Sequence, residues 1–155
     1  MNDHTESQAE DNLLVLERIF KATPEQVFDA FASAEAMKQW FGPEGCQVLE
    51  ANLDFRVGGQ YHLQITTETG PIDLVGIYQT IERPNHLAFS WRWENNDAFQ
   101  PCDSYVEIIF RRDPRGTFMR LVQTGIDHEQ DRNNHVLGWN STLDKLEQFF
   151  PPIQK

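Results

Sequence analysis

The sequence VLGWNSTLDKLEQFF, residues 136–150, decides the fold class of this chain. Within it, large apolar side chains recur at intervals of three and four residues, at Val136, Trp139, Leu143, Leu146 and Phe150. This spacing is typical of a helix with one apolar face. We expect the helix to begin after the polar segment 127–134 and to end before Pro151-Pro152, because proline cannot continue a helix. Such a helix must bury its apolar face against another element.

Upstream of this helix, the apolar period changes from that of a helix to that of a strand. Tyr61, Leu63 and Ile65 alternate with polar residues, which indicates a strand with one buried face. The same reasoning, with turns marked by Gly, Pro and Asn, predicts strands in the segments 13–20, 48–53, 61–65, 74–81, 87–93, 105–112 and 117–124. Strands followed by a helix indicate an α+β fold, in which the helix packs on one face of an antiparallel sheet.

Two short helices are predicted between the first and second strands. Thr23 is placed to cap the first helix, with Pro24 at its first position and Gln26 completing a capping box. Ser33 is placed to cap the second helix, which we expect to end at the segment WFGP, residues 40–43.

The composition describes one acidic domain. The chain has 155 residues, with 24 Asp and Glu against 13 Lys and Arg, and a formal net charge of −11. We expect residues 12–150 to form a single domain between a disordered acidic tail, residues 1–11, and a C-terminal tail, residues 151–155. The negative charge argues against nucleic acids and anionic membrane surfaces as partners.

Further features favour a cytoplasmic protein. No uncharged apolar run approaches the roughly 18 residues of a membrane helix, and the polar N-terminus does not resemble a secretory signal. Cys46 and Cys102 do not form a C-x-x-C pair and are expected to be reduced thiols. The cluster Arg111, Arg112 and Arg115 is interpreted as the solvated end of a hairpin rather than a binding patch.

Four short motifs, in this order and spacing, carry a resemblance to a known family. They are WFGP at 40–43, DFRVGG at 54–59, GW at 138–139 and LDKL at 143–146, and the hairpin DPRGT at 113–117 adds to them. Together they resemble the Hsp90-ATPase-activator-like family of the START-like (polyketide cyclase, Bet v 1-like) superfamily. The resemblance implies a helix-grip fold, a curved antiparallel sheet wrapped around a long C-terminal helix. It does not imply one function, because the superfamily includes lipid carriers, hormone receptors, cyclases, aromatases and co-chaperones.

A helix gripped by a curved sheet leaves space where the two surfaces diverge, and this space is the expected ligand site. Aromatic side chains suit its walls, because each offers a large contact area. The predicted ligand-binding residues are Trp40, Phe41, Phe55, His62, Trp91, Trp93, Met119, Leu121, Gln123, Trp139 and Leu143. Trp139 could instead be ordinary core, and Trp91 and Trp93 could point outward. Gly58-Gly59 is interpreted as a bend between strands, not as a phosphate-binding loop.

Three functions are compatible with these patterns. The first is binding of a hydrophobic small molecule, such as a lipid, a sterol or an aromatic or polyketide-like compound. The second, suggested by the resemblance, is a co-chaperone-like interaction with an Hsp90-type chaperone, with Trp91 or Trp93 as exposed anchors. A weak homodimer through an exposed sheet edge, or a monomer, is the expected state.

The third function is a cyclase or aromatase activity, which needs polar groups inside an apolar pocket to move protons. The candidate groups on strands are His62, Asp73, Arg92, Glu94 and Gln123. No catalytic set is legible among them, so we lean against an enzyme and expect no cofactor.

The histidines predict no metal site either, because none of them is spaced with a second ligand as in zinc sites. Asp127-His128-Glu129 is interpreted as a solvated loop. His135 is expected to be a surface or capping-region residue near the start of the long helix, with Asp131 and Asn133 as possible caps.

Overall fold

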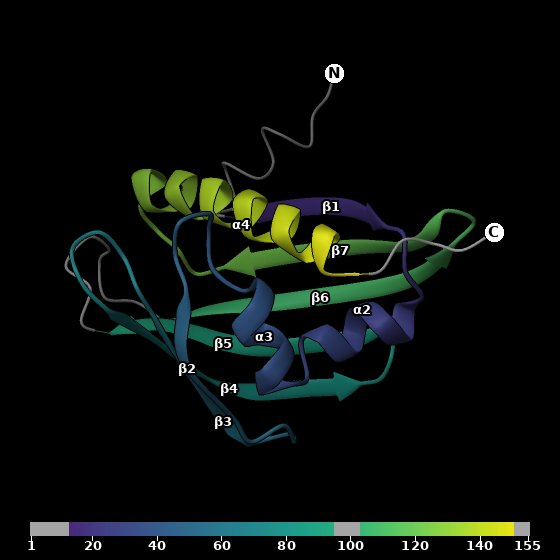
Figure 1. The fold of residues 1–155 in the computed structure, drawn as a ribbon, viewed down its shortest axis with the longest axis horizontal. Coiled ribbons are helices and arrows are strands. Elements are labelled where there is room, and N and C mark those ends of the chain that lie inside the picture. The colour runs from purple at the N-terminus through teal and green to yellow at the C-terminus, as the bar shows by residue number, and fades with distance from the viewer. Residues whose placement is uncertain (1–12, 95–102, 151–155) are drawn as a thin grey trace.

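A computed structural model describes residues 13–94 and 103–150 of the chain. The predicted tails 1–11 and 151–155, most of the polar loop that precedes Ser104, and Cys102 lie outside the described residues. Within that part of the chain, seven antiparallel strands form one sheet in the order β1-β7-β6-β5-β4-β3-β2. Helix α4 crosses one face of this sheet beside β1, and α2 and α3 cover the same face nearer to β4 (Figure 1).

The predicted α+β class and helix-grip arrangement are confirmed. The elements are β1 (Leu14–Phe20), α2 (Pro24–Ala30), α3 (Ala34–Trp40), β2 (Val48–Leu53), β3 (Gln60–Ile65), β4 (Ile72–Glu82), β5 (His86–Glu94), β6 (Ser104–Asp113), β7 (Gly116–Thr124) and α4 (Glu129–Phe149). None of the described helices combines the length and the apolar character that a membrane crossing requires.

The two short helices begin where their capping residues predict. The backbone N–H of Gln26 donates to Thr23 Oγ1 over 3.1 Å, and the Thr23 N–H donates back to Gln26 Oε1 over 2.8 Å. Ser33 Oγ accepts from the N–H of Ala36 over 3.1 Å. These bonds satisfy N–H groups that have no partner inside a helix, so each helix starts at a defined residue.

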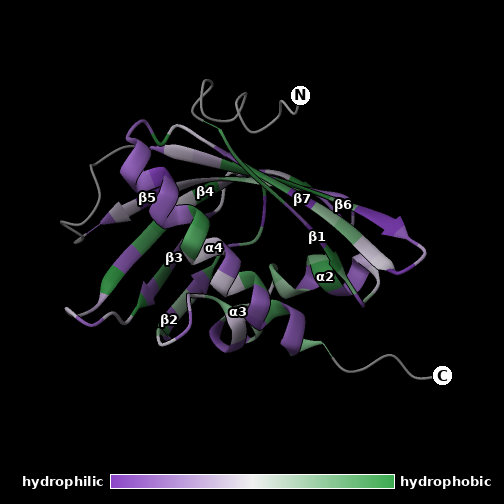
Figure 2. Cartoon of the chain, turned by 90° about the horizontal axis from the view of Figure 1, so that it is seen from above, coloured by the Kyte–Doolittle hydropathy of each residue, from purple (hydrophilic) through white to green (hydrophobic). Residues whose placement is uncertain are grey.

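Alternation along the strands decides which side chains face the helices. Tyr61, Leu63 and Ile65 are buried, whereas His62 and Gln64 between them lie on the opposite face. On β5, Trp91 has the same parity as the buried Leu87 and Phe89 and points inward. Figure 2 shows hydrophilic turns at both ends of α4 with hydrophobic turns between them, and its buried residues include Trp139, Leu143 and Leu146.

The start of α4 differs from the prediction. The helix begins at Glu129, so the segment 127–134 is not a polar loop, and Asp131 lies inside the helix instead of capping it. The sequence pattern missed these turns because their buried side consists of Asp131 and His135 instead of apolar residues. His135 is therefore not a surface residue: it is buried, with an exposed fraction of 6%.

The Gly58-Gly59 pair has the backbone role that was expected of it. Gly58 has a φ of +86°, a conformation that L side chains rarely adopt. A Cβ at Gly59 would lie 2.0 Å from the carbonyl oxygen of Asp54, so only glycine fits there. The pair turns the chain from β2 into β3 and bonds to the backbone of Tyr78 on β4.

Candidate functional site

A cavity of about 280 Å³ lies between the N-terminal half of α4 and the strands β3, β4 and β5. Its walls include Ile65 and Ile72 from the sheet, and Gly138 from the helix. The loop between α3 and β2 forms the third side of the cavity and contributes Pro43 and Cys46. The arrangement is the space predicted between a curved sheet and the helix that it grips.

Two side chains of α4 hold that loop in place. The Lys145 ammonium donates to the carbonyl oxygen of Gly42 over 3.0 Å, and more weakly to that of Cys46 over 3.4 Å. Ser141 Oγ accepts from the N–H of Glu44 over 2.7 Å. The cavity wall formed by the loop is thus bonded directly to the helix, and its position depends on α4.

Aromatic rings make up the inner wall of the cavity. The ring of Trp91 lies 5.1 Å from that of Trp139 and 5.6 Å from that of Trp93, measured between centroids. Phe41 closes the group, with its ring 6.2 Å from that of Trp139. Because these rings pack edge to face or tilted on one another, each is held by its neighbours and the wall is rigid.

His135 lies at the edge of this aromatic wall and is held neutral. Its Nδ1 lies 2.7 Å from the carbonyl oxygen of Asp131, and its Nε2 lies 2.9 Å from the indole Nε1–H of Trp93. Since the indole can only donate, Nε2 must accept, and the proton of the neutral ring sits on Nδ1. Burial lowers the pKa of His135. The hydrogen bond to the Asp131 carbonyl and the charge of the Asp131 carboxylate act in the opposite direction, but burial has the larger effect.

The four indole N–H groups of the chain differ in their partners. Trp40 donates to the carbonyl oxygen of Ala30 over 3.0 Å, and Trp139 donates to Gln123 Oε1 over 2.9 Å. Trp93 donates to His135, as described above. The Nε1–H of Trp91 is buried and has no hydrogen-bond partner within the described residues.

The structure brings together part of the predicted ligand-binding set. Phe41, Trp91, Trp93 and Trp139 line the cavity. Ligand contact by these four residues stays a prediction.

Other predicted residues lie in the core around this wall without lining the cavity. These are Trp40, Met119, Leu121, Gln123 and Leu143. Gln123 supports the wall, since its side chain accepts from Trp139 and donates to Ser104 Oγ over 3.0 Å. Phe55 lies elsewhere, with its ring 4.8 Å from that of Tyr78 and 6.1 Å from that of Phe28.

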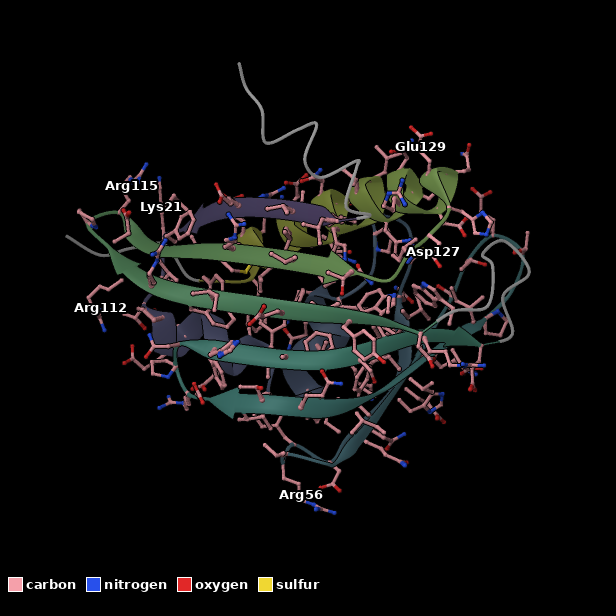
Figure 3. All side chains as sticks on the ribbon, turned by 180° about the vertical axis from the view of Figure 1, so that it is seen from behind. Lys21, Arg56, Arg112, Arg115, Asp127 and Glu129 are labelled. Atoms are coloured by element: carbon pink, nitrogen blue, oxygen red, sulfur yellow. The ribbon has the colours of Figure 1, made fainter. Side chains whose placement is uncertain are left out.

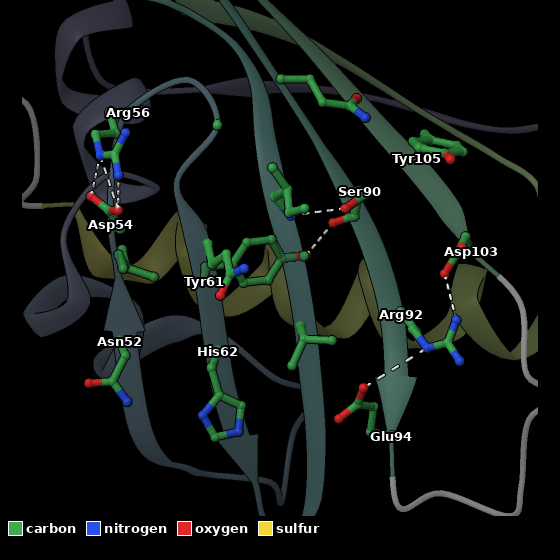
Figure 4. A pocket seen from close by; sticks show the side chains of 17 residues that line it. Asn52, Asp54, Arg56, Tyr61, His62, Ser90, Arg92, Glu94, Asp103 and Tyr105 are labelled. Carbon is green, nitrogen blue, oxygen red and sulfur yellow. Dashed lines mark hydrogen bonds and ion pairs between the residues drawn. The ribbon is translucent and has the colours of Figure 1, made fainter.

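His62 lies on the outer face of the sheet, away from the cavity. Figure 4 shows it in an open polar groove, with α4 behind the sheet. Its Nε2 lies 2.7 Å from Asp73 Oδ1, and Arg92 on the same face donates to Asp103 over 2.8 Å. Glu94 also lines the groove. The predicted catalytic candidates therefore do not converge on the cavity, because strand alternation directs four of them outward and places Gln123 in the core.

Sequence reasoning missed His135 and Thr142 as cavity residues. Both lie on the buried side of α4, four residues before and three residues after Trp139. Both positions already lay within the predicted helix, and their i, i+4 and i, i+3 spacing from Trp139 was the signal that could have identified them. Thr142 is 4% exposed and is one of the few polar residues that line the cavity.

The basic cluster at the β6–β7 turn has acidic and aromatic partners. Arg115 pairs with Asp113 over 2.9 Å, and Arg112 lies 3.4 Å from Glu25. Arg111 stacks 4.9 Å above the ring of Phe118. Figure 3 shows Arg112 and Arg115 projecting at this end of the sheet, as expected of a solvated hairpin end.

Residues 13–94 and 103–150 contain no cluster of three or more His, Cys, Asp or Glu side chains suited to a metal ion. Cys46, at the cavity, is a free thiol.

Comparison with known proteins agrees with this architecture. The solved structure of a protein from Chromobacterium violaceum is 29% identical, with a TM-score of 0.81, covering 92% of this chain and 99% of that one. The AHSA1 protein of Silicibacter pomeroyi is 29% identical, with a TM-score of 0.75 over 88% of this chain and 95% of its own. A protein from Rhizobium leguminosarum is 28% identical, with a TM-score of 0.77 over 88% of this chain and 92% of its own.

Among curated proteins, none matches the chain. The model of one protein family matches residues 21–151, which span the two short helices, the sheet from β2 onward and α4. The resemblance carried by the four motifs is thereby confirmed, and the chain belongs to the family described as activator of Hsp90 ATPase homolog 1-like proteins.

Proposed function

We propose that this protein binds a small hydrophobic molecule in the cavity between the sheet and α4. The observation that carries the proposal is the wall formed by Trp91, Trp93, Trp139 and Phe41 around an internal space of about 280 Å³. An apolar cavity lined by aromatic rings with a few polar groups is the usual form of a small-molecule site. The polar groups here are few, with His135 and Thr142 on the helix side.

The size of the cavity narrows the class of ligand. Its volume of 280 Å³ is roughly twice the ~150 Å³ of an engineered cavity that accepts benzene. It also lies just below the ~300–1,000 Å³ typical of pockets for drug-sized ligands. Among lipids, sterols and aromatic or polyketide-like compounds, the volume favours a compact aromatic compound of about two rings.

A protein partner is less well supported by the positions of the tryptophans. The anchors expected for a chaperone were Trp91 and Trp93 as exposed side chains. Trp91 is 5% exposed, and Trp93 is only partly exposed and donates to His135. Strand parity places both on the inner face, which does not favour a role as surface anchors. An interaction with an Hsp90-type chaperone stays a prediction that rests on the family alone.

An NMR screen of the isotopically labelled protein tests the proposed function. The library holds fatty acids, sterols, flavonoids and small bicyclic aromatics. We expect the bicyclic compounds to shift amide and indole resonances of Trp91, Gly138 and Trp139, while the resonances of Phe55 on the far side stay unchanged. A library that shifts no resonance around the cavity would contradict the proposal.

Two variants of α4 make the screen specific. Thr142→Phe fills the cavity from the helix side, since Thr142 is buried in its wall. Leu137→Phe adds an aromatic ring on the solvent side of the same helix, where Leu137 is 70% exposed. We expect the first variant to lose binding and the second to keep it. Equal binding by both would place the ligand outside the cavity.

A further inference from the structure

The cavity carries no formal charge on any described residue that lines it. Among residues 13–94 and 103–150, the lining includes no Lys, Arg, Asp or Glu, and its only titratable ring is that of His135. Both nitrogens of that ring are engaged, one by the Asp131 carbonyl and one by the Trp93 indole. A charged ligand would therefore lose its hydration without gaining an opposite charge, which strongly opposes binding.

The same wall contains one hydrogen-bond donor that the protein leaves unused. Trp91 is 5% exposed, and its Nε1–H has no acceptor among the described residues. Buried donors in proteins nearly always have a partner, so an unused one needs an explanation. The other three indoles, on Trp40, Trp93 and Trp139, all have acceptors.

Trp91 lies beside the space that a ligand would occupy, and its nitrogen becomes accessible once a neighbouring side chain moves. Its indole borders the cavity and also a narrow apolar gap of about 20 Å³ beneath it, which Met37 and Phe41 help to line. The nitrogen itself is covered, so a ligand atom must displace a neighbouring side chain to reach it. Met37 is suited to yield, because methionine has a flexible side chain that repacks easily.

We propose that the cavity selects an uncharged ring compound with an oxygen acceptor, such as a cyclic ketone, whose oxygen accepts from the Nε1–H of Trp91. This inference rests on the proposed function and specifies its ligand. Thr142 lines the same cavity, and a threonine hydroxyl can donate to or accept from a second oxygen. Carboxylates of the same size are excluded by the uncharged lining.

Three compounds with one bicyclic skeleton test the proposal: tetralin, 1-tetralone and tetralin-1-carboxylate. The measured quantities are their dissociation constants and the indole ¹H–¹⁵N resonances of the protein. We expect 1-tetralone to move the Trp91 indole proton downfield, whereas tetralin does not. The carboxylate should bind more weakly than either neutral compound.

A pair of tryptophan variants isolates the hydrogen bond. Trp91→Phe keeps an aromatic ring but removes the donor. The ratio of 1-tetralone to tetralin affinity should therefore fall roughly tenfold, which corresponds to the loss of one buried hydrogen bond. Trp40→Phe is the matched control, because Trp40 does not line the cavity and its N–H is already bonded to the carbonyl oxygen of Ala30, so its loss should leave the ratio unchanged. Should Trp91→Phe fail to fold, the downfield shift in the unmodified protein still decides the question.

The outcomes separate the two proposals. If tetralin and 1-tetralone both bind, but the Trp91 indole does not move and the ratio is the same in Trp91→Phe, the hydrogen bond is refuted while the hydrophobic site stands. Tighter binding of the carboxylate would refute the selection of uncharged ligands. If none of the three compounds binds, the proposed function itself is contradicted.

Discussion

The two ends of the apolar core use the same residue types but pack them differently. At the end near α2, the rings of Phe28 and Phe31 lie 5.6 Å and 5.8 Å from that of Phe110. Trp40 joins this group, 4.8 Å from Phe31, and its indole donates to Ala30. These side chains are at most 2% exposed, and the one side-chain donor among them, the Trp40 N–H, is paired. We call this group the filled end.

The other end of the core, around the N-terminal half of α4, is hollow. Trp91, Trp93 and Trp139 are also large, buried or partly buried aromatics, but they surround a cavity instead of filling it. The N–H of Trp91 has no partner there within the described part of the chain, and His135 occupies a buried position of the helix that an apolar residue would usually fill. Aromatic content therefore does not distinguish a core from a binding site, whereas unfilled volume and unused donors do.

The largest expected effect comes from truncating the filled end. Phe110 is fully buried between the rings of Phe28 and Phe31. Phe110→Ala should lower the free energy of unfolding by about 3–5 kcal/mol, because it removes a buried ring and leaves a cavity. Denaturant unfolding measures this loss.

The matched truncation at the hollow end is Ile72→Ala. Ile72 is partly exposed and already borders open space, so its loss creates less new cavity. We expect a clearly smaller fall in the free energy of unfolding than for Phe110→Ala. Equal losses would mean that the two ends are packed alike, and the contrast between them would not hold.

A smaller effect should appear as a pH dependence of stability. Burial lowers the pKa of His135 below its ordinary value, so the folded protein resists protonating this ring. As the pH falls below about 6.5, the unfolded chain takes up a proton there that the folded chain does not. The contribution of His135 to stability is therefore complete above that pH and is lost progressively below it.

The His135→Gln variant isolates this contribution from the other histidines. It carries no titrating ring, so the free energy of unfolding should fall less steeply between about pH 7 and pH 5 than in the unmodified protein. Protonated His135 would also present an N–H to the Trp93 indole donor, so Trp93 fluorescence should change over the same range. Parallel stability curves for the two proteins would show that the ring titrates normally.

Local sequence patterns predicted most of the helices and strands at the filled and the hollow end of the core. They did not predict that one end is filled and the other hollow. The Thr23 capping box and the alternation of Tyr61, Leu63 and Ile65 are local signals, and the structure has both. The outward position of His62 follows from that same alternation. The first turns of α4 escaped prediction, since Asp131 occupies a buried helical position without being apolar. The cavity and the unpaired Trp91 donor depend on how closely α4 approaches the sheet, which no local pattern encodes.

The smallest expected effect is a gain in stability at the hollow end. Gly138 lies within α4 on the cavity wall, and a Cβ added there would meet only Pro43 Cγ, at the ordinary contact distance of 3.7 Å. Alanine favours a helix over glycine by about 1 kcal/mol, so Gly138→Ala should raise the free energy of unfolding by up to about that amount. The added methyl group also takes volume from the cavity, so ligand affinity should fall while stability rises.

The control for these opposite changes in stability and ligand affinity is Asn133→Ala. Asn133 is exposed on the same helix and does not line the cavity. It should raise stability through helix propensity alone and leave affinity unchanged. If Gly138→Ala left affinity unchanged as well, the helix side of the cavity would not contact the ligand. Suppose that Gly138→Ala raises stability and lowers ligand affinity, whereas Asn133→Ala raises stability alone. This result would indicate that the protein gives up some stability at the hollow end to keep the cavity open.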